Sequence, residues 1–170
     1  MLIPIATLIA VAAMMLAELW LSRSNEQWMF DHGAIAAPDP VYSTMKWAYP
    51  AAFIAMAAEG VIVGGPSEGA AIAGVILLVL AKAVKFWAIV SLGKRWTYRV
   101  LVMPGSPLVA SGPYRVIRHP NYVGVVGELI AMALLSGARV TGVLGVIGFG
   151  WLLIQRIGAE ERALGLRTGA

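Results

Sequence analysis

Apolar stretches alternate with short polar stretches along the whole chain. At a rise of 1.5 Å per residue, about 20 helical residues cross a hydrocarbon core of about 30 Å. The apolar pattern predicts five transmembrane helices, over residues 2–21, 47–63, 70–92, 122–135 and 140–154. We therefore expect an all-α integral membrane protein, with one membrane domain over residues 1–170. Its last two helices form a hairpin, and helix continues beyond the membrane at the C-terminal end.

Polar segments between the apolar stretches complete this organisation. Arg23 follows the first stretch, whereas a signal peptide carries its charge before the apolar region, so we expect a retained first helix. "GGPSEG" at 64–69 and "SGAR" at 136–139 are typical of turns. The segment 93–121 is too long for a simple connection between helices.

Composition supports a membrane protein and excludes several site types. Of the 170 residues, 59% are hydrophobic and 13% are charged, against about 45–50% and about 25% in soluble domains. No cysteine is present, which excludes disulfides, thiolate metal sites and a cysteine nucleophile. The net charge of +4 comes from basic residues that flank apolar segments, so we expect no nucleic-acid partner.

The distribution of Lys and Arg predicts the orientation in the membrane. Segments 22–46, 93–121 and 155–167 hold ten of them, and the opposite side holds only Arg139. Cytoplasmic loops carry the excess of basic residues. We therefore expect these three segments and the C-terminus to lie in the cytoplasm. The ten residues are Arg23, Lys46, Lys94, Arg95, Arg99, Arg115, Arg118, Arg156, Arg162 and Arg167.

A first polar motif, "PGSPLVASGPYRVIRHPNY", precedes the fourth apolar stretch. Pro120 suits the first turn of a helix and favours an extended conformation at His119. His119 should therefore lie at the helix entrance, beside backbone N–H groups that favour an anion or a polar ligand. In the alternative interpretation, Arg115 and Arg118 anchor the chain to lipid headgroups and His119 is a solvated cap.

A second polar motif, "QRIGAEERAL", follows the fifth apolar stretch. Arg156 and Glu160 are four residues apart and share a helix face. They could form an ion pair worth about 0.2–0.5 kcal/mol, although the order with the acid first is the better one. Glu161 supplies a second acid, so one carboxylate can stay available for a ligand.

Four charged residues lie inside the apolar stretches: Glu18, Lys82, Lys85 and Glu128. Such groups are expensive in a membrane and normally face a partner or a wet cavity. Lys82 and Lys85 share a helix face, and Glu128 could pair with either. A structural pair is favoured over a role in acceptor binding, and Glu18 could shape the entrance for an acceptor.

"SGPYRVIRHPNYVG", followed after two apolar segments by "RIGAEERAL", resembles the isoprenylcysteine carboxyl methyltransferase family over about residues 75–165. The resemblance implies an enzyme that uses S-adenosyl-L-methionine, releases S-adenosyl-L-homocysteine, and holds the cofactor at the cytosolic membrane face. Pro107 departs from the pattern because it removes a backbone donor. Carried over by position, the cofactor contacts fall on Ser106, Pro107, Leu108, Val109, Tyr114, His119, Pro120, Asn121, Tyr122 and Glu160.

The same resemblance implies that Arg156 binds the acceptor and takes part in catalysis. The guanidinium suits the oxygen atoms of a carboxylic acid or a phenol. A carboxylate acceptor, as in isoprenylcysteine, needs no general base, whereas a phenol or enol needs one, and His119 is the neutral candidate. We expect a lipophilic small-molecule or prenylated acceptor that enters from the bilayer, contact with membrane lipids, and no metal.

The N-terminal third narrows the resemblance. "ELWLSRSNEQWMFDHGAIAAPDPVY" and "LGKRWTYRVLVMPGSPLV" are similar to the bacterial subgroup linked to type III polyketide synthases. That subgroup implies O-methylation of alkylresorcinols or alkylpyrones and a multi-pass protein of the bacterial inner membrane.

Two other classes share part of the pattern. Membrane sterol reductases also carry an Arg-His-Pro-Asn-Tyr string and bind NADPH, but they are much longer, and the extra phosphate calls for more basic residues. A non-enzymatic membrane scaffold or transport subunit would use the charged residues within the apolar stretches, and it leaves both polar motifs unexplained.

Overall fold

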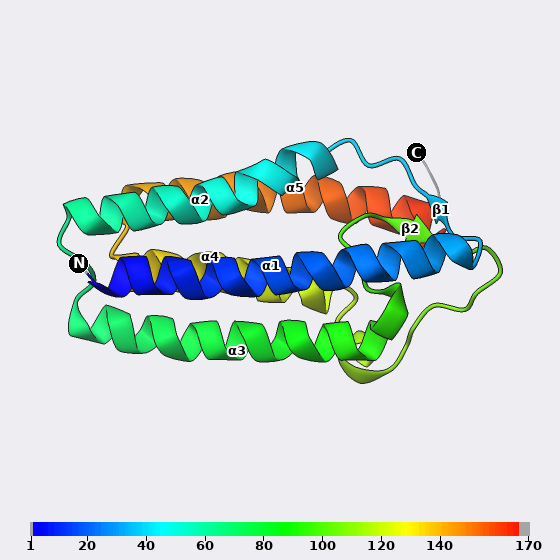
Figure 1. Ribbon diagram of the computed structural model, residues 1–170, viewed down its shortest axis with the longest axis horizontal. Helices are drawn as coiled ribbons and strands as arrows, with labels where there is room; N and C mark the ends of the chain where they lie inside the picture. Colours follow the sequence, from blue (N-terminus) through cyan, green and yellow to red (C-terminus); the bar gives the residue numbers. More distant parts are fainter. Residues whose placement is uncertain (1, 167–170) are drawn as a thin grey trace.

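Five long helices form an elongated bundle in the computed structural model, which describes residues 2–166 (Figure 1). They alternate in direction, so that the start of α1 and the end of α5 lie at opposite ends of the bundle (Figure 1). The helices are α1 (Leu2–Asp31), α2 (Tyr42–Ile62), α3 (Glu68–Leu92), α4 (Pro120–Ser136) and α5 (Val140–Ala163).

Short elements gather at the end of the bundle where α3 ends and α4 begins, which we call the site end. They include two 3-10 helices, η1 (Gly93–Arg95) and η2 (Gly112–Arg115). A two-residue antiparallel ladder pairs β1 (Ile35–Ala36) with β2 (Leu101–Val102). The expected helical fold class is thus confirmed, and this small ladder is added to it.

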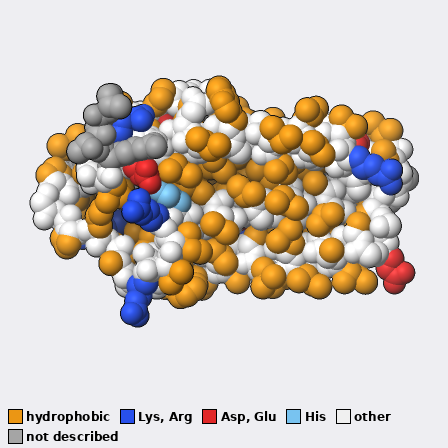
Figure 2. All heavy atoms as spheres, turned by 180° about the vertical axis from the view of Figure 1, so that it is seen from behind, with side chains coloured by type: hydrophobic (Ala, Val, Ile, Leu, Met, Phe, Trp, Pro, Cys, Tyr) orange, Lys and Arg blue, Asp and Glu red, His pale blue; other side chains and the backbone are white. Residues whose placement is uncertain are grey.

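Within residues 2–166, three helical units are long and apolar enough to cross a membrane, against the five crossings expected: α1, the continuous unit Glu68–Arg95, and α5. The helix α4 is apolar but shorter. Hydrophobic side chains spread over the length of the visible face, and the charged ones gather near its two ends (Figure 2). These features are those of a multi-pass membrane protein.

The helix α1 runs ten residues beyond its predicted end at residue 21. One face of its polar continuation, with Ser22 and Asn25, is buried against the segment that follows α3. The Asn25 side chain donates a 2.8 Å hydrogen bond to the carbonyl of Trp96, and the amide of Tyr98 donates one of 2.8 Å to the Ser22 hydroxyl. These bonds fix residues 93–98 at the site end. By contrast, α5 continues to Ala163, as the expected extension required.

Glycines allow α3 and α4 to approach closely. A Cβ atom on Gly127 would lie 2.8 Å from the Cβ of Ala81, and one on Gly124 would lie 2.9 Å from the Cβ of Lys85. Small residues at such contacts let helix backbones approach each other in membrane proteins. This contact places the start of α4 beside the end of α3.

A balanced group of four charges is buried between α1, α3 and α4. Lys82 Nζ lies 3.0 Å from Glu18 and 3.2 Å from Glu128, and Lys85 Nζ lies 2.6 Å and 3.2 Å from the same two acids. The predicted pairing of Glu128 with the lysines is confirmed, and Glu18 completes the group. Two positive and two negative charges offset each other, as buried charges require.

The hairpin of α4 and α5 is closed at the opposite end. Gly137 ends α4 in the left-handed conformation, with φ of 70°. The Glu59 carboxylate, from α2, then accepts hydrogen bonds from the amides of Arg139, Val140 and Thr141 at 2.8, 3.0 and 2.7 Å. A carboxylate here satisfies the unpaired N–H groups of the first turn of α5. The hairpin directs the end of α5 back to the site end.

Candidate functional site

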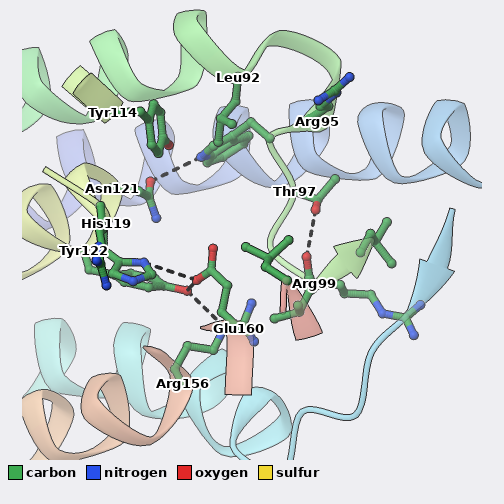
Figure 3. Close-up of a pocket in the computed structure, with 15 residues that line it drawn as sticks. Leu92, Arg95, Thr97, Arg99, Tyr114, His119, Asn121, Tyr122, Arg156 and Glu160 are labelled. Atoms are coloured by element: carbon green, nitrogen blue, oxygen red, sulfur yellow. Dashed lines mark hydrogen bonds and ion pairs between the residues drawn. The ribbon is translucent and has the colours of Figure 1, made fainter. Parts of the chain in front are cut away.

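A cavity at the site end brings both polar motifs together (Figure 3). The end of α3, the segment after it, the start of α4 and the end of α5 form its walls. Six of the residues expected in the site line it: Tyr114, His119, Asn121, Tyr122, Arg156 and Glu160. Its other lining residues are Leu92, Arg95, Trp96, Thr97, Arg99, Val100, Leu101, Arg118 and Leu164.

Tyr122 joins the start of α4 to the end of α5. Its hydroxyl donates a 2.6 Å hydrogen bond to Oε2 of Glu160 and accepts one of 3.2 Å from Nε of Arg156. Nδ1 of His119 lies 3.7 Å from the same Glu160 oxygen, and the His119 ring stacks on that of Tyr122 at 5.6 Å between centroids. Residues from the two motifs are therefore connected by one continuous set of polar contacts.

Glu160 is the more accessible of the two acids that contact His119, with 29% of its side chain exposed against 14% for Glu161. Its contacts within the described part of the chain use Oε2. The other carboxylate oxygen points away from Tyr122 (Figure 3). One oxygen is thus held in place, and the second can accept a hydrogen bond from a cationic ligand group.

Arg156 is buried and surrounded by four partners. Nη1 pairs with the Asp39 carboxylate, and Nη2 donates to the carbonyl of Tyr98. The guanidinium also lies 5.5 Å from the centre of the Tyr42 ring. The alternative of a simple ion pair within α5 is replaced by these contacts, because Tyr122 lies between Arg156 and Glu160.

Asp39 was missed by the sequence reasoning. It lies between β1 and α2 and is nearly as buried as Arg156, with 8% of its side chain exposed. A sequence signal was present, since Asp39 stands between Pro38 and Pro40 just before an apolar helix. That position is typical of a residue that caps a helix, and Oδ1 does accept the amide of Tyr42 at 3.1 Å. No pattern in the neighbouring sequence indicates that Asp39 pairs with Arg156 of α5.

His119 lies at the entrance of α4, with Pro120 as the first residue of the helix, as predicted. The expected open set of backbone donors is only partly present, because the amides of Tyr122 and Val123 bond to the carbonyl of His119 at 3.1 and 3.3 Å. Nε2 of His119 lies 3.3 Å from Glu161. Both ring nitrogens therefore face carboxylates.

Trp96 and Tyr114 give the cavity an aromatic surface beside Asn121. The indole of Trp96 donates a 3.2 Å hydrogen bond to the Asn121 side chain. Burial, and next the charge of Glu160, raise the pKa of Tyr114 above its usual value. Burial and then Glu18 raise the pKa of Tyr98, which lies next to the cavity and does not line it. Both phenols are therefore neutral at physiological pH, and Tyr114 offers a flat, uncharged face.

The remaining expected cofactor residues do not line the cavity: Ser106, Pro107, Leu108, Val109 and Pro120. The first four lie in the segment between β2 and η2. Arg95, which does line the cavity, donates a 2.7 Å hydrogen bond to the carbonyl of Pro107. This segment is therefore tied to the cavity wall, and its contact with a cofactor stays a prediction.

The residues present fit the chemical groups of S-adenosylmethionine. Glu160 suits its cationic groups, Tyr114 and Trp96 supply flat surfaces for a purine, and the Asn121 side chain supplies polar atoms. The cavity has a volume of about 90 Å³, below the ~300–1,000 Å³ of small-molecule sites. A ligand of that size would require lining side chains to move outward, and Arg118, with 77% of its side chain exposed, has the room to do so.

A model of the isoprenylcysteine carboxyl methyltransferase family matches residues 74–165. The chain belongs to this family. The matched range holds every expected cofactor and acceptor residue, and it excludes Asp39 and Tyr42.

Two relatives extend the comparison. The protein YpbQ of Bacillus subtilis, which is uncharacterized, is 39% identical over 150 residues, covering 87% of this chain and 88% of its own length. An uncharacterized protein of Haemophilus influenzae is 32% identical over 92 residues, covering 54% of each chain. No solved structure matches the chain.

Proposed function

We propose that this protein is an S-adenosylmethionine-dependent methyltransferase that methylates an oxygen atom of a lipophilic acceptor. The observation that carries the proposal is the joining of the two motifs in one cavity, where the Tyr122 hydroxyl bonds to both Arg156 and Glu160. Membership of the methyltransferase family supports the reaction class.

Glu160 and the aromatic surface would hold the cofactor. The free oxygen of Glu160 accepts from its ammonium group, a charge-assisted hydrogen bond. Tyr114 and Trp96 border the purine. When bound, the cofactor supplies a methyl group on a positively charged sulfur, which becomes neutral as the methyl leaves.

Arg156 would hold the acceptor oxygen. A guanidinium carries five N–H donors. Nη1 and Nη2 therefore each retain a second N–H beyond the one directed at Asp39 or at the carbonyl of Tyr98. Arg156 lines the cavity, so these donors can fix the acceptor oxygen near the methyl group. Positioning of this kind, in a site that excludes water, is a large part of the catalysis that a methyl transfer requires.

The bundle supplies the route for the acceptor. Large apolar side chains on α3 and α5 face outward, where lipid would surround them, among them Val79, Phe86, Leu144 and Trp151. The acceptor class we propose is a long-chain carboxylic acid or a long-chain phenol or enol, which reaches the site end from the bilayer. By the distribution of Lys and Arg, that end faces the cytoplasm.

Cofactor binding and methyl transfer test this proposal together. Purified protein in detergent is titrated with S-adenosylhomocysteine, and methyl-labelled cofactor is supplied with prenylcysteines, alkylphenols, alkylresorcinols and alkylpyrones in turn. Saturable binding and label in one acceptor class support the proposal. Absence of both contradicts it.

One observation favours a second candidate, an NADPH-dependent reductase. Arg95, Arg99 and Arg118 line the cavity beside Arg156, which is more basic character than a methyl donor requires. Titration with NADPH separates the two candidates, because saturable binding of NADPH in place of S-adenosylhomocysteine would favour the reductase.

A further inference from the structure

Arg156, proposed above to hold the acceptor, is already paired with an acid. Its side chain is 7% exposed, and that of its partner Asp39 is 8% exposed. The Asp39 carboxylate comes from the loop before α2, outside the range that the family model matches. In a site with little water, such a pair offsets most of the positive charge that an incoming anion would otherwise meet.

The two acids next to Arg156 oppose a second anion at its guanidinium. Glu160 bonds to the same Tyr122 hydroxyl that accepts from Arg156, so a carboxylate brought to Arg156 would lie close to two other carboxylates. Like charges that share a buried site disfavour each other. A neutral hydroxyl group meets no such repulsion, and it can still accept from the second N–H groups of Nη1 and Nη2.

We propose that Asp39 is a positioning residue that sets the acceptor class: by offsetting the charge of Arg156, it makes the acceptor side of the cavity select a neutral hydroxyl over a carboxylate. The inference rests on the proposed methyl transfer. In that step a lone pair of the acceptor oxygen forms the bond to the methyl carbon. The carbon–sulfur bond breaks with its electron pair on sulfur, and the hydroxyl proton passes to His119, the candidate base that lines the cavity, and from there to water outside.

The geometry of Asp39 allows its charge to be removed while its hydrogen bond to the start of α2 is kept. Oδ1 accepts the amide of Tyr42 at the start of α2, and Oδ2 pairs with Arg156. Asp39→Asn keeps an oxygen for the Tyr42 amide and removes the charge. Asp39→Glu keeps the charge and serves as the matched control.

The experiment compares two acceptors with the same alkyl chain, an alkylphenol and an alkylbenzoic acid, with methyl-labelled cofactor and full-length protein in detergent. We expect the wild type to have the higher kcat/KM for the phenol. In Asp39→Asn the ratio of the two kcat/KM values should shift toward the acid by about tenfold or more, the scale of one charge-assisted contact. Asp39→Glu should retain the wild-type preference, and S-adenosylhomocysteine should bind all three proteins alike.

Each other outcome has a distinct meaning. If Asp39→Asn lowers the turnover of both acceptors by the same factor, Asp39 has only a structural role and the inference is wrong. Should Asp39→Asn fail to bind S-adenosylhomocysteine because it does not fold, the wild type still decides, since a higher kcat/KM for the acid overturns the inference. A wild type that binds no cofactor and methylates neither compound instead contradicts the proposed function.

Discussion

The hydroxyl of Tyr122 donates a 2.6 Å hydrogen bond to the carboxylate of Glu160, across 38 residues of sequence. Tyr122 is in the first turn of α4 and Glu160 is in the last turn of α5. The bond fixes one oxygen of Glu160, and the same hydroxyl accepts from Arg156. Tyr122 thus connects the residue proposed to hold the cofactor with the residue proposed to hold the acceptor.

Tyr122→Phe should therefore weaken both functions of the cavity. Phenylalanine retains the ring that stacks on His119 and loses only the hydroxyl. A buried partner left unsatisfied costs roughly 1–3 kcal/mol, or about 5–150-fold in an equilibrium constant. We expect the affinity for S-adenosylhomocysteine, measured by calorimetry, and the turnover, measured by label transfer, each to decrease by a factor within that range. Unchanged values for both would remove the linking role.

Close packing of α3 on α4 should limit the stability of the site end. Gly127→Leu would force a side chain into Ala81, whose Cβ already lies 2.8 Å from the Cβ position of residue 127. Overpacking of this kind costs about 1–3 kcal/mol or more, so we expect a lower Tm and lower cofactor affinity. Gly148→Ala is the matched control, because a Cβ there meets nothing within 4 Å. The helix propensity of alanine should raise Tm slightly, and an equal loss in both variants would contradict the packing account.

The buried charges should behave as a balanced unit. Lys85→Met leaves Lys82 alone with Glu18 and Glu128, and breaking a buried pair in this way costs about 3–5 kcal/mol. Adding Glu128→Gln restores the balance of charge. Thermal unfolding in detergent should therefore show the double variant to be less destabilised than the sum of the two single variants. Additive losses would mean that the charges act independently.

The orientation can be measured directly because the chain contains no cysteine. Lys94→Cys places a thiol at the site end, and Glu68→Cys places one at the opposite end of α3. A membrane-impermeant maleimide should label Glu68→Cys in spheroplasts and label Lys94→Cys only after permeabilisation. The reverse pattern would show that the site end faces outward.

The helices could be predicted from the sequence wherever neighbouring residues determine where a helix begins and ends. Apolar length and turn residues predicted five helices, and Pro120 predicted the start of α4. The end of α1 was wrong because Ser22 and Asn25 read as loop residues. Their partners, the amide of Tyr98 and the carbonyl of Trp96, lie more than 70 residues away, and no local pattern encodes such a contact.

The candidate site likewise contains residues that the sequence predicts and one that it does not. His119, Tyr122, Arg156 and Glu160 were predicted from motif and resemblance, and the structure brings them into one cavity. Asp39 was not predicted, because its pairing with Arg156 depends on how the loop before α2 meets α5. The intramembrane lysines were predicted to pair with Glu128, since helical spacing alone places both on one face.

The most direct test of the central claim is the affinity of S-adenosylhomocysteine for the wild type and for Glu160→Gln, measured by calorimetry in detergent. The account predicts saturable binding to the wild type and a loss of about 10–100-fold in the variant, the value of a hydrogen bond to a charged group. Glu68→Gln, at the far end of α3, should bind as the wild type does. Equal affinity in the wild type and Glu160→Gln, or no binding to the wild type at all, would contradict the account.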